Sequence, residues 1–171
     1  MFGNLFKRKK INEPPDTTGI TIFLLQNRLE RFTTEQLNLA MQTAWCRPHA
    51  PGTFFATTVG DEGAIVKVNE AFYPIIHQDY RLTSEELGEC TVPSWADHHA
   101  ASSILAKFPG GVSDEKLPML YGFLGLLVGQ LATTSTRALF FKEAGVFVPA
   151  TPEVIARLKT PAEYLPASLL D

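Results

Sequence analysis

The chain has 171 residues, of which 45% are hydrophobic and 19% are charged, and its formal net charge is -3. That length supports one well-buried core and is too short for two independent ones. A net negative charge gives no general attraction to nucleic-acid phosphates, which call for a basic face, so we expect no nucleic-acid partner.

Residues 1–19 are read as a flexible basic leader, with Lys7–Lys10 as its charge cluster and Pro14 and Pro15 near its end. A secretory signal places its charge before an apolar core, and here the order is reversed. Contact of the leader with a membrane surface is the alternative, but its few apolar residues would bind only marginally. We expect a single α+β domain over residues 20–171.

The first half of that domain begins with a continuous apolar run, Ile20–Leu25, as expected for a strand covered on both faces. A helix is predicted over Thr33–Trp45, with Thr33 as N-cap and Gln36 completing a capping box. The turn signal Gly60–Gly63 then joins two strands, which predicts a hairpin.

The second half repeats this order. Strands are predicted over Ser102–Phe108, Arg137–Phe141 and Val146–Val148, and an apolar helix over Leu117–Ala132. A last short helix starts at Pro152, after a threonine N-cap. The pattern therefore predicts an α+β fold in which a tandem β-α-β-β repeat forms a mixed or antiparallel sheet with helices packed on it, plus a short C-terminal helix.

Two further features bear on location. The longest apolar stretch, Leu117–Val128, is interrupted by glycines and is shorter than the ~20 residues that span a bilayer. Cys46 and Cys90 lie in different halves and match no secreted disulfide framework. We therefore expect no transmembrane segment, free thiols and a cytoplasmic protein.

Much of the unusual side-chain chemistry lies in a long connector between the halves, Asn69–Ala101. Loops of that length in a compact domain are commonly functional. Two clusters are candidates for partner or ligand binding: the stronger comprises Trp95, Asp97, His98 and His99, and the second comprises His77, Asp79 and Tyr80.

Catalytic and metal-binding interpretations lack supporting motifs. The string Asp97-His98-His99 is also the signature of a metal-dependent phosphoesterase family, but the Asp-x-Asp motif that such a two-metal site needs does not occur in the chain. Cys46, His49 and Cys90 with the two histidines suit zinc chemically, yet their spacing fits no common structural-zinc pattern. We expect no metal, no other cofactor and no catalytic residue.

The segment from Trp95 to His99, the strand and apolar helix after it, and the paired strands at Arg137–Val148 resemble the uncharacterised bacterial domain-of-unknown-function family 4261. The resemblance covers mainly the second half of the chain and implies no activity. The doubled β-α-β-β order is also similar, in architecture alone, to gyrase-inhibitor-like domains that bind small molecules.

The sequence thus favours a non-catalytic, cytoplasmic protein that binds a protein partner, for example an immunity-type protein that neutralises a toxin. One alternative is a small-molecule-binding domain that uses the cleft between the two halves. The other is a hydrolase that uses Asp97, His98 and His99.

Overall fold

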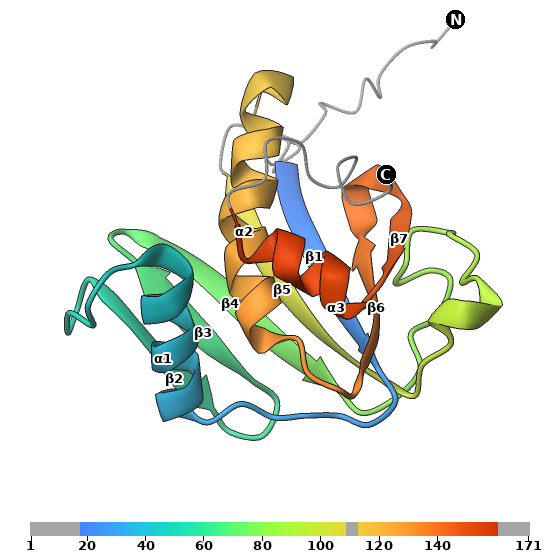
Figure 1. Cartoon of the computed structure of the whole chain (residues 1–171), viewed down its shortest axis with the longest axis horizontal. Helices are drawn as coiled ribbons and strands as arrows, with labels where there is room; N and C mark the ends of the chain where they lie inside the picture. Colours follow the sequence, from blue (N-terminus) through green and yellow to red (C-terminus); the bar gives the residue numbers. More distant parts are fainter. Residues whose placement is uncertain (1–17, 109–112, 161–171) are drawn as a thin grey trace, which may run out of the picture.

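The computed structural model describes residues 18–108 and 113–160, so nearly all of the predicted leader lies outside the described residues. The strands are β1 (Thr18–Gln26), β2 (Phe54–Val59), β3 (Gly63–Val68), β4 (Ala71–Gln78), β5 (Ala100–Phe108), β6 (Thr136–Phe141) and β7 (Val146–Pro149). The helices are α1 (Thr34–Trp45), α2 (Leu117–Leu131) and α3 (Pro152–Leu158), and the short 3₁₀ turns are η1 (Ser94–Ala96), η2 (Asp114–Lys116) and η3 (Lys142–Ala144). Figure 1 shows the arrangement of these elements.

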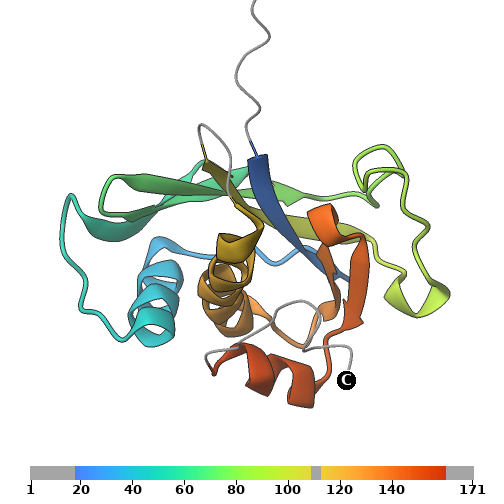
Figure 2. The same cartoon turned by 90° about the horizontal axis from the view of Figure 1, so that it is seen from above.

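The strands form one seven-stranded sheet in the order β2-β3-β4-β5-β1-β6-β7, and every neighbouring pair is antiparallel. The three helices of the described residues lie on one side of this sheet (Figure 2). The predicted α+β class, the helices packed on the sheet and the short C-terminal helix are therefore confirmed. We call the side of the sheet without helices the outer face.

The order strand, helix, strand, strand occurs in both halves, but an additional strand, β4, lies in the segment that the sequence assigned to the connector. It separates β3 from β5, whereas β1 pairs directly with β6. The two halves are thus not placed equivalently in the sheet. Strand β4 was not predicted because it contains Pro74, and proline cannot donate a hydrogen bond to a strand ladder. The pairing of β4 with β5 begins one residue later, at Ile75.

Helix α1 forms where its local signals place it. The Thr33 hydroxyl accepts a hydrogen bond from the Gln36 N–H at 3.2 Å, and Gln36 Oε1 accepts one from the Thr33 N–H at 2.9 Å. These two bonds satisfy donors that a helix start otherwise leaves free. The helix ends at Trp45, and the next residue, Cys46, has a φ of 49°, which lies in the left-handed region.

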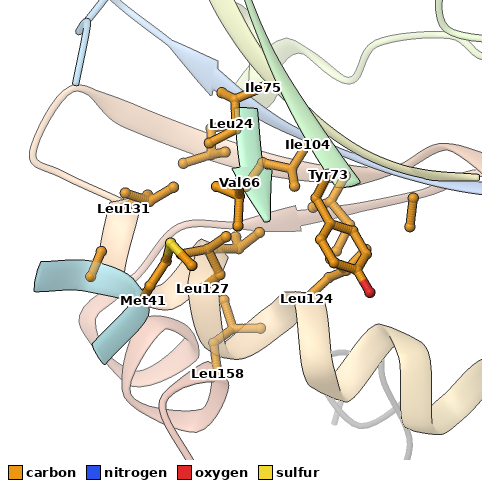
Figure 3. Close-up of a cluster of buried hydrophobic side chains, with 14 of the residues drawn as sticks. Leu24, Met41, Val66, Tyr73, Ile75, Ile104, Leu124, Leu127, Leu131 and Leu158 are labelled. Carbon is orange, nitrogen blue, oxygen red and sulfur yellow. The ribbon is translucent and has the colours of Figure 1, made fainter. Parts of the chain in front are cut away.

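The main core lies between the sheet and the helices (Figure 3). Leu24, Val66 and Ile104 of the sheet meet Met41 of α1 and Leu127 of α2, and each of these side chains is fully buried. Burial of one such side chain contributes roughly 1.5–3 kcal/mol. The contact of both helices with the sheet fixes the loop between β1 and α1, which forms one wall of the site described below.

A smaller core lies on the outer face, where the connector packs against β1, β5 and β6. Phe23 and Leu25 of β1 and Phe140 of β6 are buried there against Leu82 and Leu87 of the connector. This explains why β1 reads as a continuous apolar run, since it is covered on both faces. The connector is therefore a packed part of the domain between residues 82 and 96.

Candidate functional site

His98 lies inside the connector with only 1% of its surface exposed. Its Nε2 accepts a hydrogen bond from the Leu82 N–H at 3.2 Å, and its Nδ1 donates to the Ala96 carbonyl at 3.2 Å. Burial, opposed in part by the Ala96 hydrogen bond, holds the pKa of His98 below its ordinary value, so the ring is neutral at neutral pH. Both ring nitrogens are occupied, and His98 holds the connector together.

The other members of the first predicted cluster point outward. Asp97 forms an ion pair with Arg81 at 3.2 Å and accepts a hydrogen bond from the His98 N–H at 3.1 Å. Trp95 and His99 are exposed. The four residues therefore do not line a common cavity, and in a hydrolase using Asp97, His98 and His99 the buried His98 would have no ring nitrogen free for substrate.

The second predicted cluster is also divided. Tyr80 Oη and the Gln78 amide donate to Glu86 Oε1 at 2.8 and 3.1 Å, and this network closes the start of the connector. The Thr83 backbone N–H is the main cause that lowers the pKa of Glu86. Asp79 is exposed beside it. His77 is one residue inside the strand end, and strand alternation turns it to the helix-covered side of the sheet.

His77 is held in a polar row across three strands. Its Nδ1 lies 2.9 Å from Ser102 Oγ, and Ser102 Oγ donates to Gln26 Oε1 at 3.4 Å. Because that bond uses the one serine proton, Ser102 accepts from the Nδ1–H of His77, and Nε2 carries the lone pair. Burial, and then the charge of Arg31, lower the pKa of His77. The Phe32 ring lies 5.7 Å from the imidazole centre.

A cavity of about 280 Å³ opens beside His77, and we call it the His77 cavity. It lies where the loop before α1, the β2–β3 turn and the end of β4 meet. Its lining is made up of Arg31, Phe32, Thr33, Thr34, Thr58, Gly60, Asp61, Gly63 and His77. From the sequence, the turn and the helix cap were assigned structural roles alone. The cavity was not predicted, because the sequence did not reveal strand β4, which brings His77 next to both.

A groove of similar volume runs between α1 and α2, on the other side of Phe32. Its walls come from Leu39 and Ala40 of α1 and Leu131 of α2, and they carry no charged side chain among the described residues. This groove offers apolar contact and hydroxyl or amide groups, without an acid, a base or a nucleophile pair.

The outer face is open over β2, β3 and β4. Val59, Phe72 and Ile76, one from β2 and two from β4, are 52%, 55% and 43% exposed. Phe55, Ile65 and Leu105 on the same face are half-buried. Lys67 and Lys107 lie at one end of this area, and Asp61 and Glu62 lie in the β2–β3 turn at the other end.

The described residues contain no group of three or more histidine, cysteine or acidic side chains placed to hold a metal ion. No helix among them is long and apolar enough to cross a bilayer.

No family model, curated protein or solved structure matches the chain. The resemblance to family 4261 therefore stays a prediction.

Proposed function

We propose that the chain is a non-catalytic binding protein whose protein partner docks on the open part of the outer face. The observation that carries the proposal is the exposure of Val59, Phe72 and Ile76 on one face of β2 and β4, the two strands that flank β3. Contiguous apolar areas of this kind are uncommon on monomeric proteins and mark interaction surfaces. Phe72 is an aromatic anchor of the type that dominates binding energy at interfaces.

The surroundings of this area indicate the chemistry of the partner. The Lys67 ammonium lies 5.2 Å from the centre of the Phe72 ring, so an apolar anchor and a positive charge stand side by side. The acidic β2–β3 turn flanks the opposite end of the area. A partner with an apolar patch, acidic groups toward Lys67 and basic groups toward Asp61 would be complementary, and complementary charge gives specificity and a faster encounter.

A toxin neutralised by this chain, as an immunity-type role requires, is one partner consistent with such a surface. The sequence placed the contact at the connector. The proposal moves the centre of the contact to β2, β3 and β4, with Tyr80, 49% exposed, four residues after Ile76 along the chain. The cytoplasm is the location that we propose, because Cys46 and Cys90 are free and cytoplasmic thiols stay reduced.

A matched pair of variants tests the proposal. Phe72→Asp places a charge in the outer face. Met119→Asp places one at a 65% exposed position of α2, and α2 lies on the other side of the sheet (Figure 2). Wild type and both variants are checked for fold by circular dichroism, then used as bait against extract of the native cell. Sedimentation velocity of the purified chain shows whether a second copy is the partner.

We expect wild type and Met119→Asp to retain the same partner. Phe72→Asp should bind that partner at least about tenfold more weakly, which is the effect of removing one interface anchor. Equal retention by all three proteins would contradict the proposal. So would a partner lost only from Met119→Asp.

A further inference from the structure

The His77 cavity brings Arg31, an imidazole ring and threonine hydroxyls together around one small space. Arg31 Nε donates to the Asp61 carbonyl at 3.0 Å, which fixes the guanidinium at the cavity wall and leaves its terminal N–H groups available. The imidazole is fixed from behind by Ser102, and its Nε2 has no hydrogen bond to another described residue. A cation and a fixed ring nitrogen thus line one small space.

Threonine hydroxyls add donors to this wall. Thr34 Oγ1 accepts from the Thr58 N–H at 3.2 Å and lies 3.2 Å from Thr58 Oγ1. Only one of the two hydroxyl protons is used between them, so the other is free to donate. The same corner is the start of α1, where the helix dipole favours negative charge.

We propose that the His77 cavity binds a small oxyanion of the phosphate class, held between the Arg31 guanidinium and a protonated His77 ring. The volume of about 280 Å³ lies just below the usual range for ligand pockets, so the ligand is small. Planar guanidinium and threonine donors match the oxygen atoms of phosphate. Asp61 borders both this site and the outer face, but the other residues of the cavity do not belong to the outer face, and the site does not depend on the partner proposed above.

Binding of a dianion would be coupled to a proton. In the free protein, burial and the charge of Arg31 lower the pKa of His77. An anion placed beside Arg31 offsets that charge and stabilises imidazolium, so the pKa of His77 rises in the complex. The other charged groups near the ring are Asp61 and Glu62 of the β2–β3 turn. The Glu62 carbonyl accepts a hydrogen bond from the backbone N–H of His77. Strands β5 and β1 contribute the neutral side chains of Ser102 and Gln26.

Sulfate is the first probe, because it stays a dianion throughout the range where histidine titrates. The ring signals of His77 are followed by NMR over pH, with and without sulfate, in the full chain. We expect sulfate to raise the pKa of His77 and to bind more tightly as pH falls toward the pKa of the free protein. The exposed His49 and His99 report non-specific effects of salt in the same spectra.

Three variants sharpen the test. Arg31→Gln should weaken sulfate binding at least about tenfold, the usual effect of losing a charge-assisted hydrogen bond. Arg28→Gln is the matched control, since Arg28 lies in the same loop, is 82% exposed in its side chain and does not line the cavity. Asp61→Asn keeps the carbonyl that holds Arg31 and removes a negative charge, so it should tighten binding.

Inorganic phosphate and phenyl phosphate then separate the two sources of the oxyanion. Tighter binding of phenyl phosphate assigns an organic monoester whose ring contacts Phe32, and equal or weaker binding assigns the free ion. The proposal fails if sulfate leaves the pKa of His77 unchanged. It fails equally if Arg28→Gln and Arg31→Gln weaken binding to the same extent.

Discussion

The Asn38 carboxamide occupies the place of a neighbouring strand beside Ala56. Its Nδ2 donates to the Ala56 carbonyl at 3.0 Å, and its Oδ1 accepts from the Ala56 N–H at 2.9 Å. Two residues along β2, the Thr58 N–H donates to Thr34 Oγ1. Strand β2 is one of the two edge strands of the sheet, and an edge with free backbone groups pairs readily with other chains. Helix α1 blocks that edge with its own side chains.

Replacing Asn38 by Ala should therefore both destabilise the fold and expose a strand edge. Loss of the two hydrogen bonds is expected to cost about 1–3 kcal/mol, because the Ala56 groups are left without a partner near the core. Urea unfolding measures the stability, and light scattering against protein concentration measures association. Thr43→Ala, which removes a hydroxyl bonded only to its own helix at Leu39, is the control and should change neither.

If Asn38→Ala associates no more than Thr43→Ala does, the edge is closed by something other than the carboxamide. The closed β2 edge also bears on partner binding. A partner that added a strand to β2 would have to displace Asn38, whereas the outer face is accessible without any rearrangement.

His98 should be needed for stability and its neighbour should not. His98→Ala leaves the Leu82 N–H and the Ala96 carbonyl without partners and opens a void in the connector, which is expected to cost about 2–5 kcal/mol. The exposed His99, replaced by Ala, should stay within about 0.5 kcal/mol of wild type. Chemical denaturation of both variants decides this. A loss below about 1 kcal/mol for His98→Ala would contradict the structural role that we assign.

Stability should fall as the solution becomes mildly acidic. The pKa values of His77 and His98 in the folded protein lie below the ordinary 6.5, so the unfolded chain takes up these protons first. Their contribution is fully present above pH 6.5 and is lost as pH falls through the folded pKa values. Glu86 acts in a separate window, below its ordinary pKa of 4.5.

Denaturation series at several pH values test this prediction. His98→Gln keeps hydrogen-bonding atoms but does not titrate, so its stability should fall less steeply between neutral pH and about pH 5 than that of wild type. His77→Gln, added to His98→Gln, should remove the remaining pH dependence of stability in this range. A profile that is equally steep in wild type and in the double variant would show that other groups carry the pH dependence.

Local signals were enough to predict most elements. Thr33 and Gln36 close the start of α1, and Thr151 accepts from the Val154 N–H at the start of α3. Each depends on residues within three or four positions, which a sequence displays directly. The turn signal between β2 and β3 was equally local.

The functional surfaces were harder to predict because long-range pairing creates them. His77 and Tyr80 are three positions apart, yet one lies on the helix side of the sheet and the other in the connector network. The sequence could not show that Arg31 and Asp61, thirty positions apart, meet at one cavity wall. From the sequence, His98 was a candidate for partner or ligand binding. Its burial could not be predicted, because it follows from the packing of Leu82 against the outer face.

Gly63 should be irreplaceable at the start of β3. A β-carbon there would collide with the backbone carbonyl oxygen of Ile75 in β4, and backbone atoms cannot move aside without separating the strands. Gly63→Ala is therefore expected to cost about 3 kcal/mol or more, at the high end for a single substitution. Gly19→Ala, whose β-carbon would lie 3.3 Å from the Ala106 carbonyl, should cost less than about 1 kcal/mol. Equal thermal unfolding midpoints for the two variants would contradict the difference.

The two cysteines should react as free thiols at different rates. Cys46 is exposed at the end of α1, while Cys90 is half-buried in the connector, where a β-carbon added to Gly145 would lie 3.7 Å from its sulfur. Access of the thiolate controls alkylation, so Cys46 in the native protein should be modified first and Cys90 only as the connector opens. Mass spectrometry of timed samples measures both sites. The His98→Ala variant supplies the internal control, because a loosened connector should accelerate labelling of Cys90 and leave that of Cys46 unchanged. Equal rates at both sites in wild type would mean that the connector is not packed as described.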